Sequence, residues 1–395
     1  MLLQQLTIQN LLSFGDIPCV VPMRPLNMLI GANGSGKSNF IEVIQLLRAA
    51  PKELTTPMRE GGGIQEWLWK GHSQGRVFGT IDATVEWSRV FHESTIHHHL
   101  ELGLLPHDFV VSAESLKSID DVLSDDATSR DVYTYSSNPI APKRPALATS
   151  SGQIELQSDL DLNRSILAQR KDPERFPEIT YLSERYERIQ IYREWSFGRA
   201  TPPRLPQKTT DRNDRLAEDF SNLGMMLNRI RRQSEAKGRL LEMLNQLYPN
   251  IDDFDVSVEG GTVQVFFQEG KFTIPATRLS DGTLRYLCLL VILLQPSPPP
   301  LVCIEEPELG LHPDVLPGLA DLLVEASQRT QLVVTTHSDV LVDALSHTPE
   351  NIVICEKQEG QTTMRRLESD ALAVWLKDYS LGELWRSGQL GGNRW

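Results

Sequence analysis

The sequence predicts an α/β protein with a mixed sheet around a phosphate-binding loop, an antiparallel β-lobe and a helical insertion. A strand, a G-x-x-x-x-G-K-S loop and a helix follow one another over residues 25–50, the arrangement in which this motif binds phosphate. Apolar segments at 301–304 and 331–334 each end in polar side chains, as buried parallel strands do at a ligand crevice. Residues 77–87 and 95–105 alternate between apolar and polar types, the pattern of half-buried antiparallel strands.

Composition allows a sizeable core and argues against several protein classes. Hydrophobic residues make up 40% of the 395 residues, which suits one large domain with insertions or two smaller domains. No run of 18 apolar residues is present, so we expect no transmembrane helix. The N-terminus lacks the basic region and cleavage site of a secretory signal, so we expect a cytoplasmic protein. Widely spaced cysteines are then free thiols in a reducing compartment; they are Cys19, Cys288, Cys303 and Cys355.

Charge is distributed unevenly along the chain. The net charge is −13, whereas residues 183–240 carry 13 Lys/Arg against 8 Asp/Glu. A basic region on an acidic protein is consistent with a nucleic-acid contact, and equally with a solvated helix whose faces carry salt bridges. The side chains that we assign to a DNA contact are Arg229, Arg231 and Arg232.

The loop over residues 31–39 has the residue types that bind a nucleoside triphosphate. Its glycines let the backbone curl so that N–H groups point at phosphate oxygens. Lys37 adds a mobile charge for the β- and γ-phosphates, and the Ser38 hydroxyl suits Mg²⁺. The helix from Ser38 to about Ala50 directs its positive end at the phosphates. The expected nucleotide contacts are Asn33, Gly34, Ser35, Gly36, Lys37, Ser38 and Asn39.

The segments after this loop predict a β-lobe over about 77–160. Residues 51–75 contain prolines and a run of three glycines and predict a loop or a short insertion. Residues 108–162 predict edge strands with a mobile loop or an extended hairpin arm. Three consecutive histidines, 97–99, alternate between the faces of a strand and cannot converge on one metal, so we expect surface histidines. Residues 164–169 predict a strand that ends at Gln169.

The middle of the chain predicts helices and a hairpin. Residues 178–188 predict one helix, and apolar residues at helical spacing predict two more over 211–248, capped by Asp211 or Asn213. Residues 254–258 and 262–267 predict a hairpin across two glycines.

Three companion motifs follow in the second half. Ser280-Asp281-Gly282 opens a long apolar helix and predicts an anion-binding helix N-terminus. The strand at 301–304 leads to Glu305, which suits Mg²⁺, and Glu306, which suits orientation of an attacking water. The strand at 331–334 leads to His337, which could hydrogen-bond a γ-phosphate. Taken singly, these motifs also fit a helix cap, two solvated acids and a capping histidine.

Together, the motifs resemble those of ABC-type ATPases of the RecF, SMC and OLD-like branch, including stand-alone AAA_21-type and AAA_15-type prokaryotic ATPases. The resemblance covers residues 1–50, about 160–200 and 275–370. It implies a single ABC-type ATPase domain over residues 1–395, in which 275–370 form the lobe with the signature, Walker B and switch-histidine motifs.

Roles for individual residues follow from this resemblance. It implies that residues 31–38 are the Walker A loop and that Glu306 and His337 are the catalytic glutamate and the switch histidine. Mg²⁺ would be held by Ser38, Glu305 and the Q-loop glutamine Gln169. The signature, which reaches the ATP of a second subunit, comprises Ser280, Asp281 and Gly282. The chain departs from the family pattern with Asp281 in place of glycine, Thr283 in place of glutamine and, in the D-loop, His312 in place of aspartate.

The resemblance also implies a function. We expect an ATPase that forms a homodimer or higher oligomer through ATP and acts on or senses DNA without contacting a membrane. A separately encoded effector, commonly a nuclease in anti-phage defence, would be its partner. A RecF-like DNA repair or recombination ATPase and the ATP-binding subunit of an ABC transporter stay open as alternatives. The Trp/Gly-rich tail, residues 371–395, fits either a partner-docking segment or a strap on its own domain.

Overall fold

The computed structural model describes residues 1–71, 78–89, 92–105, 108–120, 128–137, 142–156, 159–161 and 163–392. Contacts divide the chain into two compact units. Unit 1 comprises Met1–Ile189, Glu350–Glu368 and Gly388–Trp395, and unit 2 comprises Gln190–Pro349 and Ser369–Ser387. Both units combine helices with strands, which confirms the predicted α/β class.

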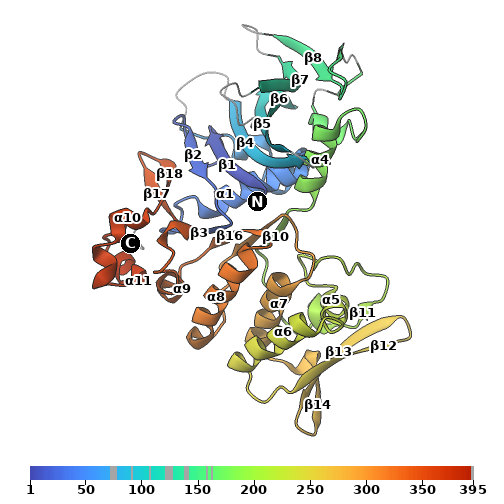
Figure 1. Ribbon diagram of the computed structural model, residues 1–395, viewed down its shortest axis with the longest axis vertical. Helices are drawn as coiled ribbons and strands as arrows, with labels where there is room; N and C mark the ends of the chain where they lie inside the picture. The colour runs from blue at the N-terminus through green and yellow to red at the C-terminus, as the bar shows by residue number, and fades with distance from the viewer. Residues whose placement is uncertain are drawn as a thin grey trace. The chain divides into compact units, whose positions relative to one another are not determined.

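Unit 1 contains an eight-stranded antiparallel sheet in the order β2-β1-β4-β5-β6-β7-β8-β9, and its strands from β2 to β8 are labelled in Figure 1. The residues predicted to alternate at 77–87 and 95–105 pair along their length as β4 and β5. The strands are β1 (Leu3–Gln9), β2 (Cys19–Pro22), β4 (Phe78–Arg89), β5 (His92–Leu105), β6 (Asp108–Asp120), β7 (Thr128–Ser136), β8 (Lys143–Ala148) and β9 (Ile154–Leu156).

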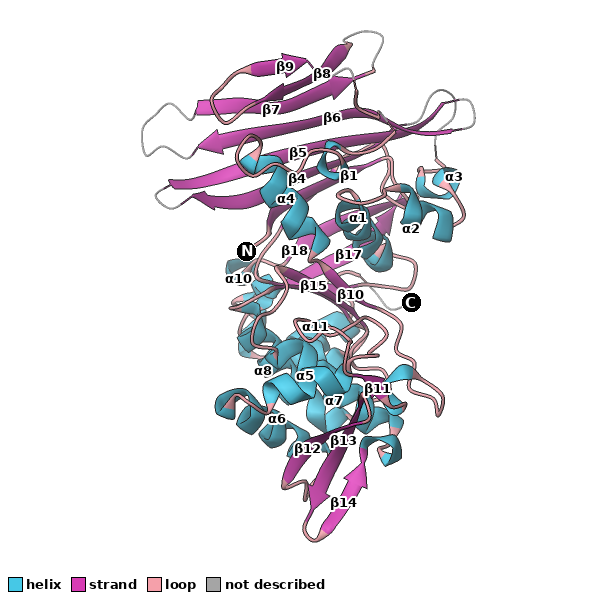
Figure 2. Ribbon diagram, turned by 90° about the vertical axis from the view of Figure 1, so that its right-hand side faces the viewer, coloured by secondary structure: helices cyan, strands magenta, loops and turns pink. Residues whose placement is uncertain are grey.

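Helix α4 (Pro177–Glu187) lies across one face of this sheet (Figure 2). The ring centroids of Trp87 and Tyr181 are 6.2 Å apart, and those of His98 and Tyr186 are 5.8 Å apart. Aromatic contacts of this kind add to the apolar area that the helix buries. The predicted helix at 178–188 is therefore confirmed, and its aromatic side chains attach it to β4 and β5.

Two predictions in unit 1 are wrong. Residues 164–169 form a 3₁₀ turn, η1 (Ile166–Ala168), because the Ser165 hydroxyl accepts a hydrogen bond from Leu167 N and closes a turn that a strand could not make. His98 is buried at 1% exposure, with Nε2 3.1 Å from Glu114 Oε1. The alternation of side chains along a strand correctly places His98 on the opposite face of β5 from His97 and His99. It does not indicate which of the two faces α4 covers.

A second, mixed set of strands positions the phosphate loop in unit 1. β3 (Leu26–Ile30) pairs in parallel with β17 (Ile352–Gln358), which pairs antiparallel with β18 (Gln361–Arg366). Helix α1 (Lys37–Ala49) starts directly after the loop and buries an apolar face that includes Phe40, Ile41, Val43, Ile44 and Leu47. The segment predicted as a loop at 51–75 also contains two short helices, α2 (Thr55–Glu60) and α3 (Ile64–Trp67).

Unit 2 contains three parallel strands whose carboxyl ends lie at one edge. They are β10 (Gln190–Tyr192), β15 (Leu301–Glu305) and β16 (Gln331–Thr335). Cys303 is in register with Ile191 on one side and with Val333 on the other. The polar residues after β15 and β16 are therefore neighbours, as the sequence predicts.

The rest of unit 2 is helical, apart from an antiparallel ribbon. The helices are α5 (Leu223–Ile230), α6 (Ser234–Leu247), α7 (Asp281–Leu294), α8 (Leu316–Ser327), α9 (Asp339–Ala344), α10 (Ser369–Leu372) and α11 (Leu381–Arg386). Single 3₁₀ turns occur at η2 (Pro202–Arg204), η3 (Ala276–Arg278), η4 (Pro313–Val315) and η6 (Trp375–Lys377). In the described part of the chain, no helix is both long enough and apolar enough to cross a membrane.

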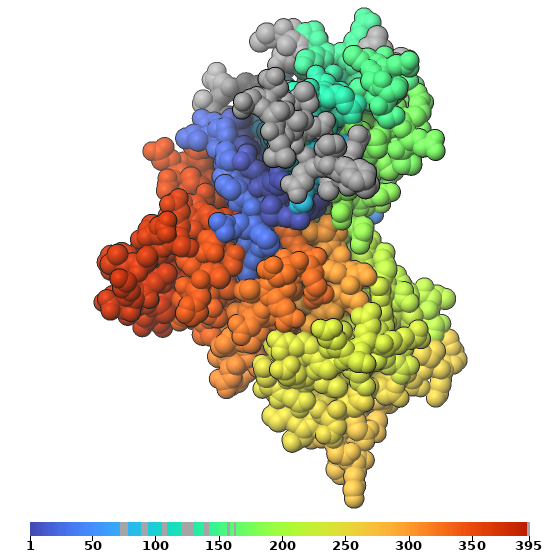
Figure 3. All heavy atoms as spheres, in the orientation of Figure 1, coloured from blue at the N-terminus to red at the C-terminus, as the bar shows by residue number. Residues whose placement is uncertain are grey.

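The ribbon confirms the predicted hairpin. β12 (Asp253–Glu259) and β13 (Thr262–Glu269) pair antiparallel across the two glycines, with β11 (Gln207–Lys208) and β14 (Phe272–Pro275) also on β13. The end formed by β13 and β14 projects as a narrow tip (Figure 3). The first helix of the 211–248 segment begins at Leu223 with Asn222 at the cap position, so the predicted caps Asp211 and Asn213 are wrong. The Asn222 amide donates to the carbonyls of Arg212 and Arg215 and stabilises a turn before the helix.

Candidate nucleotide site

The phosphate loop forms a backbone cradle before α1. Gly34 and Gly36 have φ angles of 75° and 105°, in the left-handed region that glycine adopts readily. A Cβ atom at Gly31 would lie 2.2 Å from the Cys355 carbonyl oxygen. A side chain at that position would therefore push the loop away from β17, and this close approach explains why residue 31 is a glycine.

The loop has polar groups that suit a triphosphate. Lys37 is 6% exposed, and its Nζ donates to the carbonyls of Gly31 at 2.7 Å and Ala32 at 3.0 Å. Ser35 Oγ is buried without a hydrogen-bond partner among the described residues. A buried polar atom in this condition needs a partner, and a phosphate oxygen would supply one. The residues present therefore fit the ligand that the sequence predicts.

A chain of side-chain hydrogen bonds braces the loop. Asn39 Nδ2 donates to Ser13 Oγ at 2.7 Å. The Thr362 hydroxyl on β18 lies 2.7 Å from Ser13 Oγ and 2.9 Å from the Ser35 carbonyl oxygen. Each hydroxyl can donate once while it accepts, so both can be satisfied together. Ser13 and Thr362 are positioning residues that no local sequence pattern indicates, because the turn at Ser13 and strand β18 meet the loop only in the folded chain.

Gln169 lies in unit 1 just after η1, and its amide is engaged by its own segment. Its Nε2 donates to the carbonyls of Asp161 at 2.9 Å and Arg164 at 3.0 Å, and its Oε1 accepts from Asp161 N at 2.8 Å. A role toward Mg²⁺ therefore requires release of these hydrogen bonds.

In unit 2, Glu306 has a strained backbone held by several hydrogen bonds. Its φ of 46° lies in the left-handed region, where a non-glycine residue is disfavoured by about 1–3 kcal/mol. Its N–H donates to the Thr335 carbonyl at 3.0 Å, and its carbonyl accepts from Arg285 at 2.9 Å. The strain is thus maintained at the position where the sequence predicts the catalytic carboxylate.

The predicted switch histidine lies beside this carboxylate. His337 Nε2 is 3.6 Å from Glu306 Oε1. Glu308 Oε1 accepts from His337 N at 2.7 Å and from Thr336 Oγ1 at 2.8 Å, which fixes the turn after β16. Burial raises the pKa of the Glu308 carboxyl. Glu308 is a further positioning residue, and the Glu-Glu-Pro-Glu segment in the sequence contains it without indicating its role.

Glu305 is held by basic and aromatic neighbours of unit 2. Arg193 lies 3.3 Å from Glu305 Oε1, and Trp195 Nε1 donates to the Glu305 carbonyl at 2.8 Å. The Arg285 guanidinium is 4.6 Å from the centre of the Trp195 ring, and burial lowers the pKa of Arg285 to about 10. A metal bound by the Glu305 carboxylate would share it with Arg193 or displace that ion pair.

The signature turn is a capped and exposed helix start. Ser280 Oγ accepts from Thr283 N at 3.1 Å, and Asp281 follows on α7. A Cβ atom at Gly282 would lie 2.8 Å from the carbonyl oxygen of Gly310 in the D-loop segment. Glycine at 282 is therefore required by close backbone packing, whatever the turn binds.

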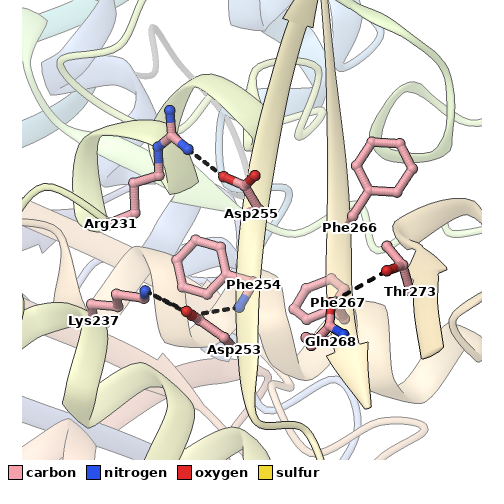
Figure 4. A pocket seen from close by; sticks show the side chains of 9 residues that line it. All are labelled: Arg231, Lys237, Asp253, Phe254, Asp255, Phe266, Phe267, Gln268 and Thr273. Carbon is pink, nitrogen blue, oxygen red and sulfur yellow. Dashed lines mark hydrogen bonds and ion pairs between the residues drawn. The ribbon is translucent and has the colours of Figure 1, made fainter. Parts of the chain in front are cut away.

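The structure brings two of the three candidate DNA-binding arginines into contact with other groups of unit 2. Arg229 donates to the carbonyl of Asn213 at 2.9 Å, and Arg231 pairs with Asp255 (Figure 4). With Lys237 and Phe254, Arg231 lines a hollow of about 600 Å³ between helices and ribbon. Arg232 is exposed.

The chain matches a family model and solved structures of Smc heads, including two that are bound to a domain of ScpA. Residues 26–343 match the family described as "AAA domain, putative AbiEii toxin, Type IV TA system". An Smc head bound to the C-terminal winged-helix domain of ScpA is 13% identical with a TM-score of 0.51, and the match covers 94% of this chain and 99% of that one. An Smc head with an extended coiled coil, bound to the C-terminal domain of ScpA and derived from Pyrococcus furiosus, is also 13% identical with a TM-score of 0.50, over 95% and 99%. No curated protein matches the chain.

The family model and the Smc heads support different parts of the assignment. At 13% identity the Smc heads show the fold, and the family model supplies the class of activity. The chain belongs to the AAA_21 family and is an ATPase whose ABC-type head fold is shared with the Smc heads.

Proposed function

We propose that two copies of this ATPase clasp ATP and Mg²⁺ between them and that this closure controls a separately encoded effector, a nuclease of prokaryotic anti-phage defence, in response to DNA. The observation that carries the proposal is the strained backbone of Glu306, whose Oε1 lies 3.6 Å from His337 Nε2. Strain is retained at positions that act in catalysis or switching. The exposed signature turn in the same unit is suited to meet a ligand held by another copy.

Each residue in this mechanism has a role that its chemistry allows. Lys37 and the N–H groups of the loop would neutralise the phosphates. The oxygen donors of Ser38 and Glu305 suit Mg²⁺, which would offset charge on the β- and γ-phosphate oxygens. Glu306 would orient the attacking water and accept its proton, and His337 would hydrogen-bond the γ-phosphate. Positioning and charge stabilisation then account for the acceleration.

Control of a partner is supported by the family and by the fold. The family description names a toxin of a toxin–antitoxin system, and both similar Smc heads are bound to a domain of ScpA. Head domains with this fold can therefore bind a second protein, which is the kind of partner contact that we propose for this chain. The DNA response rests on the basic 183–240 stretch, with Arg229, Arg231 and Arg232 as its candidate contacts. We place the protein in the cytoplasm, where such a partner and DNA are accessible.

Substitution Glu306→Gln tests the mechanism. It should retain ATP and accumulate as an ATP-bound dimer while hydrolysis falls by at least about 100-fold, the usual contribution of a general base. Sedimentation velocity with ATP and a phosphate-release assay measure the two properties. Glu259→Gln, an exposed change on the ribbon, serves as the matched control. Hydrolysis by Glu306→Gln at the wild-type rate would contradict the role of Glu306. A variant that binds ATP but stays monomeric would contradict the ATP-bound dimer.

Purification of the native complex tests the effector. A nuclease that co-purifies in a fixed ratio, and whose activity changes with ATP, is the expected outcome. A recombination protein in its place would favour the RecF-like repair ATPase, and an integral membrane protein would favour the transporter subunit. Either result contradicts the proposed effector while leaving the ATPase assignment intact.

A further inference from the structure

The signature turn carries a negative charge in an unfavourable place. Asp281 stands where the family pattern has glycine, and its side chain is 72% exposed. It is the first residue of α7, directly after the capping Ser280. In the proposed dimer, this turn faces the triphosphate of the ATP held by the other copy. A bare carboxylate there would repel the phosphates.

A buried arginine lies against this carboxylate. The Arg204 side chain is 7% exposed, and its Nη2 is 2.5 Å from Asp281 Oδ1. Its Nε donates to the Phe197 carbonyl at 2.8 Å, and its Nη1 donates to the carbonyls of Thr277 at 3.0 Å and Leu279 at 2.8 Å. Each nitrogen of the guanidinium therefore has a partner, and the charge is fixed in direction by three backbone carbonyls.

The contacts of Arg204 are concentrated on the segment that leads into the signature. Thr277 lies in η3 and Leu279 directly precedes Ser280. A planar guanidinium can bind two carbonyls and a carboxylate at once, which an ammonium group cannot do in one fixed geometry. A Cβ atom at Gly282 would lie 2.8 Å from the Gly310 carbonyl oxygen, so the backbone of the turn has little room to shift.

We propose that Arg204 is a positioning residue for the signature turn, which neutralises Asp281 and orients residues 277–282 so that the turn can approach the γ-phosphate of the partner copy's ATP. This inference rests on the ATP-clasped dimer of the proposed function. Asp281, paired with Arg204, occupies the position where the ABC-type signature pattern has a neutral glycine. Their coupling predicts that each residue is tolerated best in the presence of the other.

A double-mutant cycle tests the pairing. In the Glu306→Gln background, ATP-dependent dimerisation is measured by sedimentation for the parent, Arg204→Ala, Asp281→Gly and the variant with both changes. Arg204→Ala should weaken the dimer at least about tenfold, because a charged pair loses one partner. Asp281→Gly in that background should restore most of the loss. Raising the salt concentration should also reduce the defect, since an exposed charge is screened.

Controls separate this inference from the proposed function. A parent that stays monomeric with ATP would refute the clasp itself. A dimerising parent unaffected by Arg204→Ala would overturn the role of Arg204, and a double variant as weak as Arg204→Ala would leave Arg204 a structural residue only. Monomer affinity for a fluorescent ATP analogue should be equal in all variants. If Arg204→Ala does not fold, Arg204→Gln replaces it in the double-mutant cycle, because glutamine keeps amide donors without the charge.

Discussion

At the scale of residues, Glu308 connects the strand end of the catalytic carboxylate to the turn of the histidine. Its Oε1 accepts both the His337 N–H and the Thr336 hydroxyl. Substitution Glu308→Ala would leave two donors without this acceptor, at a cost of about 1–3 kcal/mol in the free energy of unfolding. We expect hydrolysis to fall about tenfold, with less effect for Glu308→Gln, which retains one acceptor oxygen. Steady-state phosphate release and urea unfolding measure both effects, and an active, stable Glu308→Ala would contradict them.

The pKa of Glu308 makes its contribution to stability depend on pH. Burial raises the pKa of this carboxyl in the folded chain, so the unfolded chain loses its proton first as the pH rises. The contribution of Glu308 is therefore fully present below its unfolded pKa and is lost as the pH rises through the folded pKa. The difference in unfolding free energy between wild type and Glu308→Gln should shrink over that interval. A difference that stays constant with pH would refute this assignment.

Thr362 offers a second test at this scale. Thr362→Val keeps the shape of the side chain but removes the hydroxyl that lies 2.9 Å from the Ser35 carbonyl. The change also removes the contact of that hydroxyl with Ser13 Oγ, and each of the two hydrogen bonds is worth about 1 kcal/mol. Loss of this brace should therefore lower ATP affinity by several-fold, up to about tenfold. The neighbouring Thr363→Val, on the same strand with its side chain on the other face, is the matched control. Equal ATP titration curves for the two variants would refute the brace.

At the scale of elements, the end of the described chain packs on the phosphate-loop strands. Gly392 N donates to Glu356 Oε1 at 2.7 Å, and Arg365 donates to the Leu390 carbonyl at 3.0 Å. A Cβ at Gly392 would lie 2.9 Å from Ile354 Cγ2 and 3.4 Å from Gly31 Cα. Residues 388–392 thus form a strap on their own unit, whereas Trp375 and Tyr379, earlier in the tail, are about half exposed, at 47% and 52%.

Substitution Gly392→Ala tests whether this strap supports the loop. It should lower both the melting temperature and ATP affinity, because its φ of 62° is unfavourable for alanine and its Cβ meets neighbouring atoms. Gly360→Ala is the control, since it has a φ of 82° with nothing within 4 Å. It should lower stability without reducing ATP affinity. The same affinity for both variants would show that the strap does not act on the loop.

The basic stretch gives a prediction for DNA. Arg229 and Arg231 already have partners in unit 2, so exposed Arg232 is the most informative position. Arg232→Glu should weaken DNA binding and reduce the slope of log affinity against log salt by about 1. The control is Lys271→Glu, an exposed charge at the tip of the ribbon. If Arg232→Glu changes neither the DNA affinity nor its salt dependence, the basic stretch at 183–240 is a solvated surface and not a DNA contact.

Local patterns predicted elements better than they predicted contacts. The loop and α1, the β12–β13 hairpin and the ends of β15 and β16 follow from neighbouring residues, and the sequence is sufficient for them. Partners distant in the chain are different. Thr362 reaches Ser35 through strand pairing, and Arg204 reaches Asp281 from a separate turn. No local periodicity indicates such contacts, which is also why the burial of His98 under α4 was missed.

At the scale of the whole molecule, ATP should link stability to association. A ligand that binds the folded state at 100 times its Kd adds about 2.7 kcal/mol to the free energy of unfolding. If the ATP complex is a dimer, its melting temperature must also rise with protein concentration, because unfolding then separates two chains. This behaviour distinguishes a clasp between copies from a nucleotide bound within one chain.

Glu306→Gln with Mg²⁺ and ATP is the form in which this linkage is measured, by calorimetry over a hundredfold range of protein concentration. We expect the melting temperature to increase with concentration when ATP is present and to be constant without nucleotide. Lys37→Ala in the same background removes the ammonium that lies inside the loop, 2.7 Å from the Gly31 carbonyl, so ATP should then give neither effect. If ATP raises the melting temperature equally at every protein concentration, each chain binds its nucleotide alone. The exposed signature turn would then need another ligand.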